Sequence, residues 1–499
     1  MYFKQIITAI GITVLSTPAV HSQIIKDSTK MKQLEEIIVT ANKREESIIK
    51  VNTSITSLSA KKVEDTRTWS LSGLSALVPN YNYQELGVSF QQIQAIRGIQ
   101  VFSENPAVST YIDDVNNVDI LANGFAFTDI ERIEVLRGPQ GTLYGRNAMG
   151  GVVNIITKKP SNKTNGFAEA SFGNLGLQRY SIGFKTPLVK DELFFGLNGL
   201  YQTQDGFLRN DITGTNSTDT KINGITVGGE QNLYGNIYLK WLASQRFHIT
   251  LNLKGQQDKS DNSGFMVSQI SDTYAFANPD RINLSRIAQH ERSILNTSLV
   301  AKYFEDKFTI TSISALQTIG FGFKDLDFPG IYHSFYDVEI GDQLPPQKVW
   351  SEELRINSNT DSKIQYTAGI YAFAQKGYEP TTNTAYELSE AEATAFGLPN
   401  GAFLINRNRS NNSGIAGFGE LSYLLMNSLK ATVGLRYDYE RRKAEFNGFG
   451  DALFYNGVVT DINPNRIAEG SYSALSPKFS LSYALNNLSN IYVTYTRGF

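Results

Sequence analysis

The chain has 499 residues, and its 46 Lys and Arg nearly balance its 48 Asp and Glu. This balance gives no basis for a nucleic-acid-binding surface. The sequence has no cysteine, which excludes disulfides, thiolate metal sites and cysteine nucleophiles. Its four histidines lie far apart and none has a metal-ligand spacing, so we expect no resident metal and no cofactor.

The first residues predict a secretory signal peptide over 1–22. Lys4 supplies a positive charge, Ile6 to Leu15 form a short apolar core, and small or tolerated residues precede a cut at Gln23. No later segment reaches about 18 continuous apolar residues, the length that a spanning helix needs. The sequence therefore predicts an exported protein without a helical anchor, either a membrane β-barrel or a soluble periplasmic protein.

A short β-prone run from Leu34 to Ala41 follows the predicted signal peptide and is itself followed by the polar residues Asn42 to Glu46. An extended, unpaired segment near a mobile chain end can add itself as a strand to the sheet edge of a partner. The alternative is an ordinary first strand of the folded domain.

Short elements are predicted next. The sequence indicates a strand over 48–58, a short helix from Ser59 or Ala60 to Glu64, and a second helix over 70–78 that Pro79 ends. Further along, residues 81–90 predict a loop or irregular strand whose aromatic side chains are exposed or face a ligand.

Two more segments, Gln94 to Gly98 and Ser109 to Val115, are predicted strands of one small mixed sheet. The second contains the adjacent pair Asp113 and Asp114. Neighbouring residues on a strand face opposite sides, so this pair does not suit acid–base chemistry on one substrate atom. We interpret both as solvated carboxylates at a sheet edge.

The stretch Ile130 to Pro160 is the most informative part of the chain. Two apolar β-prone runs flank a segment with five glycines and a proline, which predicts a strand, a tight glycine-cornered turn and a strand. A phosphate-binding loop would need Lys followed by Ser or Thr after the glycines. A dinucleotide site would need a helix where Val152 to Thr157 is β-branched. Neither fits.

This stretch resembles the signature of the plug domain of TonB-dependent outer-membrane receptors. The shorter segments Ile96–Gly98 and Tyr111–Val115 resemble two other plug elements. The matching signature residues are Arg137, Gly138, Pro139, Gly141, Tyr144, Gly145, Gly150 and Gly151. In that context the run near the N-terminus resembles a TonB box, made of Glu35, Glu36, Ile37, Ile38, Val39, Thr40 and Ala41.

From Gly166 onward the pattern changes to long strands that alternate apolar and polar residues. In Phe247 to Lys254 and in Leu429 to Tyr439 every second residue is apolar, as in a transmembrane barrel with one face toward lipid and the other toward water. Short turns alternate with long polar segments, which is the periplasmic and extracellular asymmetry of such barrels. The short turns are predicted near 187–192, 242–246, 304–307, 359–363, 425–428 and 486–490.

The sequence therefore predicts a transmembrane antiparallel β-barrel with an N-terminal α+β plug domain inside it. Three weaker segments, 350–355, 418–420 with 434–438, and 476–479 with 495–499, resemble barrel elements of the same family. About 13 strands are predicted, against about 22 in the family, so we expect a C-terminal truncation that lacks about nine strands, with Phe499 in mid-strand. The expected divisions are a signal peptide 1–22, a periplasmic segment 23–46, a plug 47–160 and a partial barrel 161–499.

The resemblance implies a receptor in the outer membrane of a Gram-negative bacterium, in contact with its lipid, that is not an enzyme. It implies active import of a solute, foremost a ferric siderophore, with TonB as the partner that supplies energy. Importers of a glycan or cobalamin share the same plug features, and a passive porin is the remaining alternative. The family further implies charge pairs between plug and barrel among Arg97, Arg137, Glu353 and Glu420. Predicted ligand-facing residues of the plug loops are Tyr81, Tyr83, Phe90, Phe102, Asn123, Phe125 and Phe127.

Overall fold

The computed structural model describes residues 37–85, 92–101, 105–212, 220–261, 271–284, 286–324, 326–328, 332–337, 346–359, 362–377, 382–387, 390–446, 452–456, 458–462, 466–486 and 488–498. The predicted signal peptide and four predicted site residues, Glu35, Glu36, Phe90 and Phe102, lie outside these ranges. No helix in the described ranges is both long and apolar enough to cross a membrane.

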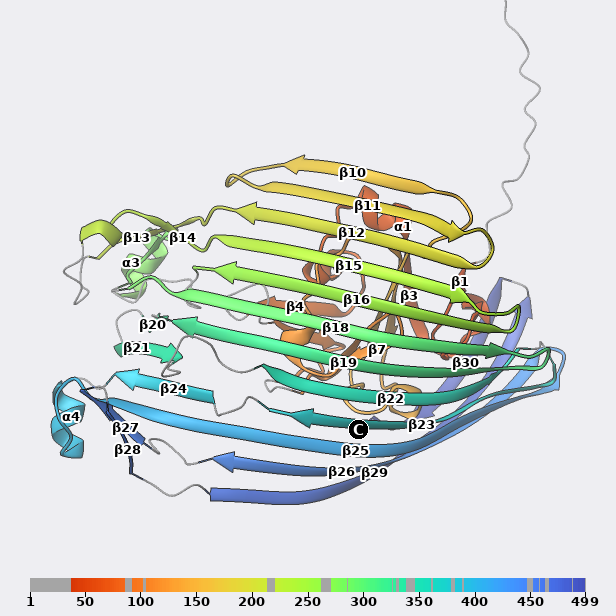
Figure 1. Ribbon diagram of the computed structural model, residues 1–499. Coiled ribbons are helices and arrows are strands. Elements are labelled where there is room, and N and C mark those ends of the chain that lie inside the picture. Colours follow the sequence, from red (N-terminus) through yellow and green to blue (C-terminus); the bar gives the residue numbers. More distant parts are fainter. Residues whose placement is uncertain are drawn as a thin grey trace, which may run out of the picture. The chain divides into compact units, whose positions relative to one another are not determined.

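Most of the chain forms one antiparallel sheet of long strands joined in chain order (Figure 1). Of the eighteen strands that are hydrogen-bonded in this sheet, five are short extensions near the long connections, which leaves thirteen long strands. The predicted barrel strands are thereby confirmed in type and number. The long strands are β10 Asn165–Phe172, β11 Gln178–Val189, β12 Leu193–Gln204, β15 Glu230–Leu242, β16 Phe247–Ser260, β18 Gln289–Phe304, β19 Phe308–Lys324, β22 Gln347–Ser358, β23 Ile364–Lys376, β25 Phe403–Met426, β26 Leu429–Phe446, β29 Arg466–Asn486 and β30 Ser489–Thr496.

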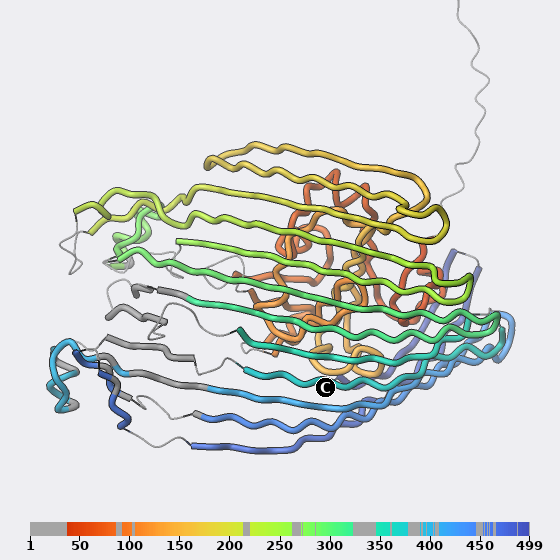
Figure 2. Tube along the Cα trace, in the orientation of Figure 1, coloured from red at the N-terminus to blue at the C-terminus, as the bar shows by residue number. Residues whose placement is uncertain are grey.

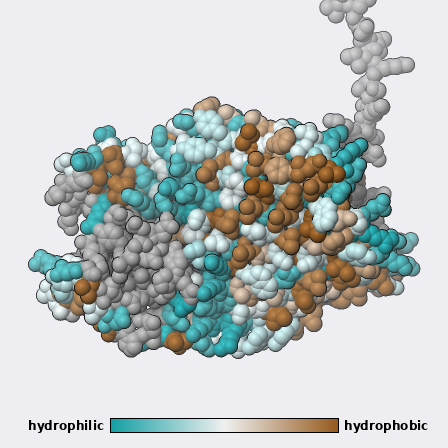
Figure 3. Space-filling view, in the orientation of Figure 1, coloured by the Kyte–Doolittle hydropathy of each residue, from teal (hydrophilic) through white to brown (hydrophobic). Residues whose placement is uncertain are grey.

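The alternation along these strands separates an apolar outer face from a polar inner face. In β16 the side chain of Leu251 is 43% exposed while that of Asn252 is 3% exposed. In β26 Leu435 is 51% exposed and its neighbour Arg436 only 3%. Apolar side chains gather over the strands on the face drawn in Figure 3. A lipid-facing outer surface and a polar interior are the arrangement of a transmembrane barrel.

The strands on either side of the six predicted short turns meet at the same end of the sheet, and four of these turns lie wholly within the described residues. The turns at 359–363 and 486–490 include residues outside the described ranges. The long connections lie at the opposite end, and their described parts contain short helices and strands. They hold a three-stranded sheet, two short α-helices, one 3₁₀ helix and the strand extensions. These elements are β13 Leu208–Asn210, η4 Thr220–Ile222, β14 Thr226–Val227, α3 Asp272–Ala277, β17 Arg281–Ile282, β20 Leu326–Phe328, β21 Tyr332–Asp337, β24 Thr382–Glu387, α4 Glu390–Phe396, β27 Ala452–Tyr455 and β28 Val458–Asp461.

The N-terminal part forms a small α+β unit against the inner face of the barrel sheet (Figure 2). Its five-stranded sheet has the order β3-β8-β9-β6-β7, with β6 and β9 parallel and the other pairs antiparallel. The strands are β3 Ser54–Ser59, β6 Val108–Ile112, β7 Val115–Asn117, β8 Ile130–Arg137 and β9 Gly151–Thr157. The predicted strand–turn–strand over the glycine-rich stretch is therefore confirmed as β8 and β9, with the one-turn helix α2 Gly141–Tyr144 between them.

Several predicted plug elements differ in detail. The helix α1, Ala60–Asp65, is present and is capped by the Ser59 hydroxyl, but the predicted helix over 70–78 is the shorter 3₁₀ helix η2, Leu71–Ala76. The predicted strand over 48–58 begins with a 3₁₀ turn, η1 Ile48–Lys50.

The strand predicted at Gln94 to Gly98 is β5, Gln92–Ile96, and it does not belong to the five-stranded sheet. It pairs instead with β4, Tyr81–Glu85, and the two strands form a separate hairpin. Of the two forms predicted for residues 81–90, residues 81–85 therefore adopt the strand. Strand pairing depends on partners distant in sequence, which local patterns do not specify.

Apolar side chains of the plug and the barrel share one core. Ile133, Val135 and Ile155 from the plug strands pack in the same buried cluster as Leu200 and Ile294 from the barrel. Burial of aliphatic groups on both sides gives the plug a broad attachment that needs no specific polar contact. Polar contacts fix its two ends.

Candidate functional site: the attachments of the plug

The predicted TonB box is folded back on the plug. Its described residues, 37–41, include strand β1, Ile38–Val39, which pairs with β2, Glu46–Ser47, in a tight hairpin. Val39 and Ala41 are buried, whereas Ile37 and Ile38 are exposed. The expectation of an unpaired segment is therefore wrong for these residues.

Glu134 holds this segment in place. Its carboxylate oxygens accept hydrogen bonds from the Thr40 backbone N–H at 2.9 and 3.1 Å and from the Thr40 hydroxyl at 3.2 and 3.1 Å. The Tyr144 hydroxyl donates to the Ala41 carbonyl oxygen at 3.0 Å, and Asn154 donates to the Thr40 hydroxyl. Glu134 is fully buried, so its negative charge depends on these donors and on Arg132, 2.8 Å away.

The hairpin lies at the short-turn end of the barrel. Lys430, beside one short turn, donates to the Lys50 carbonyl oxygen at 2.6 Å, and Asn490, beside another, donates to the Ile49 carbonyl oxygen. The Thr494 hydroxyl donates to the Asn52 carbonyl oxygen at 3.1 Å. Since short turns are periplasmic in such barrels, this end is where a periplasmic partner would reach the hairpin.

Two signature glycines permit close approaches of the backbone. Gly145 has φ +75°, and a Cβ there would lie 2.6 Å from the guanidinium of Arg436 on β26. Gly151, with φ +156°, would place a Cβ against the Leu136 carbonyl oxygen. Only glycine fits both the conformation and the space at these positions.

The predicted charge pairs form with different partners. Glu353 joins plug and barrel, but its cation is Lys43, at 2.5 Å, rather than an arginine of the plug sheet. Glu420 pairs with Lys478 of the neighbouring barrel strand at 2.8 Å. Arg97 is exposed, and Arg137 donates to the Pro79 carbonyl oxygen at 3.4 Å. The prediction that Arg97 and Arg137 pair with Glu353 and Glu420 is wrong in this structure.

The side chain of Asp113 is 15% exposed and that of Asp114 36%, but both carboxylates are paired with cations, which corrects the interpretation of two solvated carboxylates. They do face different partners: Asp113 pairs with Lys254 of β16 and Asp114 with Arg355 of β22, at 2.8 and 3.1 Å. Burial raises the pKa of the Asp113 carboxyl, but Lys254 and hydrogen bonds from Thr157 outweigh it and hold the pKa below its usual value. The pKa of Asp114 is likewise lowered, because Arg355 and Lys302 outweigh burial.

The loop that follows β7 is held by side chains of the barrel. Arg292 of β18 donates to the Leu121 and Gly124 carbonyl oxygens at 2.8 Å each and pairs with Asp258 of β16. Gln256 donates to the Gly124 carbonyl oxygen at 2.9 Å and accepts from the Ala126 N–H at 2.8 Å. We call residues 118–127 the apical loop; it lies on the side of the plug toward the long connections.

Several predicted ligand-facing residues lie inside the fold. Tyr81, Phe125 and Phe127 are at most 4% exposed and belong to the core shared by plug and barrel. Tyr83 packs against the same core and Asn123 is buried. Of the two predicted alternatives for Tyr81 and Tyr83, exposure is therefore wrong, because both pack in the core shared by plug and barrel. Their role in ligand binding stays a prediction.

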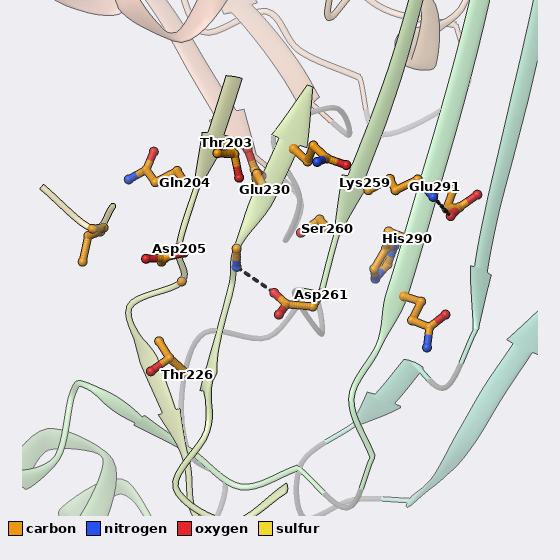
Figure 4. Close-up of a pocket in the computed structure, with 15 residues that line it drawn as sticks. Thr203, Gln204, Asp205, Thr226, Glu230, Lys259, Ser260, Asp261, His290 and Glu291 are labelled. Atoms are coloured by element: carbon orange, nitrogen blue, oxygen red, sulfur yellow. Dashed lines mark hydrogen bonds and ion pairs between the residues drawn. The ribbon is translucent and has the colours of Figure 1, made fainter. Parts of the chain in front are cut away.

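A polar pocket of about 790 Å³ lies at the long-connection ends of β12, β15, β16 and β18 (Figure 4). Asp205, Asp261 and His290 come from three neighbouring segments around it. Asp261 is fixed by the backbone N–H groups of Gly228 and Gly229, at 2.8 and 2.6 Å. Among the described residues no group of His, Asp and Glu is arranged to hold a metal ion. The pocket therefore offers hydrogen-bonding groups to a polar solute.

Comparisons with known proteins match both parts of the chain. Residues 47–152 match the family model of the TonB-dependent receptor plug domain. Residues 232–499 match the model of the TonB-dependent receptor-like β-barrel. The chain belongs to the TonB-dependent receptors. This family consists of transport receptors, which are not enzymes, and the chain is a transmembrane β-barrel with a plug.

Individual relatives of this TonB-dependent receptor are more distant. It is 23% identical over 452 residues to the pesticin receptor of Yersinia pestis, which covers 86% of this chain and 60% of that protein. The crystal structure of the ferric yersiniabactin uptake receptor FyuA from Yersinia pestis matches with a TM-score of 0.73 at 21% identity, over 89% of this chain and 64% of that one. The vitamin B12 transporter BtuB of Vibrio vulnificus is 27% identical over 231 residues, which cover 41% of this chain and 36% of that protein. The chain thus spans about three-fifths of the length of the pesticin receptor.

Sequence reasoning missed three residues that the structure places at the attachments: Lys43, Glu134 and Arg292. Glu134 carried a usable signal, because a charged residue in the middle of the apolar strand 130–137 must have buried partners. Lys43 and Arg292 carried none, since both sit in ordinary polar contexts and meet their partners only through tertiary contacts.

Proposed function

We propose that the protein is an outer-membrane receptor for TonB-dependent active import, and that its solute is a ferric siderophore. The observation that carries the proposal is the position of segment 37–41, which we call stowed because it is paired in a hairpin and packed against the plug. It lies at the short-turn end, buried at Val39 and Ala41 and held by Glu134, so that its release would give a partner a free strand. The polar pocket and the apical loop lie toward the opposite end.

The proposed cycle follows from this arrangement. A solute enters from the long connections and contacts the upper side of the plug. The plug shifts, and the segment 37–41 leaves Glu134. TonB then adds a strand to the exposed segment and pulls, with energy from the inner-membrane proton gradient, because strand addition supplies backbone hydrogen bonds without requiring a particular side chain. The apolar outer face contacts outer-membrane lipid throughout.

The siderophore assignment is supported by relatives. One is a ferric yersiniabactin uptake receptor by its name, and the structural match to it is extensive. The match to a vitamin B12 transporter supports cobalamin as the second candidate solute, although over a smaller share of the chain.

The two solutes are separated by binding measurements on the purified protein in detergent. The probes are radioactive ferric complexes of catecholate, hydroxamate and phenolate siderophores, and radioactive cobalamin. Saturable binding of a ferric siderophore, with production of the protein raised under iron starvation, is the expected result. Saturable binding of cobalamin alone, with no response to iron, would contradict the siderophore assignment.

A further inference from the structure

An apolar hollow lies on the outer face of the barrel wall, across the neighbouring strands β10, β11, β12 and β15 (Figure 1). Its volume is about 600 Å³, which is in the range of small-molecule binding sites. The exposed side chains of Tyr180, Ile182, Tyr201 and Leu233 line it, and Gly199 lies among them. The hollow therefore opens to the surroundings of the barrel and not toward the plug.

Three glycines continue this hollow across the wall. Gly199 on β12 is opposite Gly235 on β15, and Gly235 is opposite Gly255 on β16, so the three lie at one level. Among the described residues, a Cβ at Gly235 would meet no atom within 4 Å, and the nearest atoms to a Cβ at Gly199 and Gly255 would be 3.6 and 3.8 Å away. None of the three has a positive φ. Since neither conformation nor packing against the described residues requires glycine, these positions indicate the close approach of another molecule.

Outward-facing residues change from polar to apolar along this part of the wall. The level nearest the long connections is polar, and its residues are in register on five neighbouring strands: Gln178, Thr203, Gln231, Lys259 and Glu291. The next outward level holds Tyr180, Tyr201 and Leu233, and the glycine level follows it.

The tyrosine hydroxyls contact the polar level. The Gln231 amide donates to the Tyr201 hydroxyl at 2.8 Å, and the Tyr180 hydroxyl donates to the Gln178 side-chain oxygen at 3.1 Å. Tyrosines with this orientation mark the boundary between lipid head groups and hydrocarbon. The glycine level therefore lies just inside the hydrocarbon, on the side of the long connections.

We propose that the hollow binds one acyl chain of a membrane lipid, and that the head group of this lipid lies at the polar level. The occupant is a lipid because the hollow is continuous with the apolar outer face that the bilayer covers. The order of polar, tyrosine and glycine levels matches the head group, interface and acyl chain of one lipid molecule. Lys259 and Glu291 pair with each other at 2.7 Å, so the polar level has no net charge and offers hydrogen bonds to the head group.

The floor of the hollow is the reverse side of a plug contact. Leu200 and Tyr234 are the chain neighbours of Tyr201 and Leu233, so their side chains point inward. There they belong to the core that plug and barrel share. The lipid and the plug thus contact opposite sides of the same two backbone segments. A lipid that binds only the folded wall stabilises the folded protein by mass action.

The test adds dipalmitoyl phosphatidylethanolamine to the purified, lipid-free protein in detergent, and native mass spectrometry counts the bound molecules. We expect the wild type to bind one molecule more tightly than any further ones. Gly199→Leu and Gly235→Leu each fill part of the hollow. We expect each to weaken binding of the first molecule about tenfold, the effect of losing about two buried methylene contacts.

The matched control is Gly417→Leu. Gly417 on β25 is also exposed and has no described atom within 4 Å of its Cβ position, but it lies outside the hollow. This variant is expected to bind the lipid as tightly as the wild type does. The thermal unfolding midpoint gives a second measurement: the lipid raises it in the wild type and in Gly417→Leu, but not in Gly235→Leu.

Equal binding by all four proteins, or no tightly bound molecule in the wild type, would overturn the proposal. A dimer of the wild type that Gly235→Leu abolishes would also overturn it, because the hollow would then bind a second copy of the chain. Heat-shifted gel migration checks that each barrel is folded. If a leucine variant does not fold, Gly235→Ala replaces it, with a smaller expected loss of binding.

Discussion

The two ends of the plug are attached in different ways. At the apical loop, barrel side chains donate to backbone carbonyl oxygens, and Arg292 is itself fixed by Asp258 with both side chains 0% exposed. At the hairpin, Glu134 accepts from both the backbone N–H and the side-chain hydroxyl of Thr40, and the Lys43 side chain pairs with Glu353. The contacts of Arg292 with the apical loop use main-chain oxygens alone, whereas the hairpin contacts also use the side chains of Thr40 and Lys43, so a substitution within the hairpin removes part of its own hold. The comparison indicates a fixed upper attachment and a releasable lower one.

The upper attachment predicts the largest effect. Arg292→Ala removes three donors and leaves Asp258 buried without its cation, which typically costs about 3–5 kcal/mol. We expect the free energy of unfolding in detergent, followed by denaturant titration, to fall by this amount. The control, Lys259→Ala, removes the exposed pair with Glu291 and changes it by less than about 1 kcal/mol. If the two variants lower the free energy of unfolding equally, Arg292 does not anchor the upper end of the plug.

The lower attachment predicts a smaller effect on stability and a large effect on accessibility. Glu134→Gln replaces a carboxylate that accepts from both the N–H and the hydroxyl of Thr40, and the loss of such bonds costs about 1–3 kcal/mol. We therefore expect faster maleimide labelling of a cysteine at position 39, while the barrel stays folded. An unchanged labelling rate in Glu134→Gln would show that Glu134 does not hold the segment.

A third prediction concerns the contact of the signature with the barrel wall. Gly145→Ala places a Cβ beside Arg436 at a residue with φ +75°, which costs about 1–3 kcal/mol of backbone strain, the cost of an unfavourable φ. We expect a lower thermal unfolding midpoint. Gly417→Ala, at a barrel glycine with no atom near its Cβ position, serves as the control and leaves the midpoint close to that of the wild type.

The smallest expected effect is on acid stability. The pKa of Asp113 is lowered in the folded protein, so its pair with Lys254 contributes stability that is fully present above the ordinary value of 3.8 and is lost as the pH falls below it. We expect Asp113→Asn to lower stability at neutral pH and to flatten its decline between about pH 4 and pH 2. A decline as steep as that of the wild type, measured by denaturant titration across this range, would show that Asp113 does not contribute.

The repeating part of the molecule was predictable from sequence, and its attachments were not. The alternation in Phe247–Ser260 and the six short turns follow from local periodicity, which lipid on one side and water on the other impose residue by residue. The glycine-rich stretch is similarly local, because positive φ and close packing restrict the residue type.

The partners of charged residues depend on tertiary packing. Asp113 and Asp114 looked solvated because their cations, Lys254 and Arg355, lie far along the chain and reach the plug only through strand order and register. Glu353 pairs with Lys43 of the plug, and nothing local in the sequence indicates Lys43 rather than an arginine as its partner.

The most direct test of the central claim, import driven through the stowed segment, deletes residues 35–41 and compares uptake with binding. Cells that produce the wild-type protein or the deletion variant receive a radioactive ferric siderophore that the wild type binds. Binding to the cell surface is expected to remain, while uptake falls to the level of cells without the protein. Undiminished uptake by the deletion variant would contradict TonB-dependent import and would support passive diffusion through the barrel.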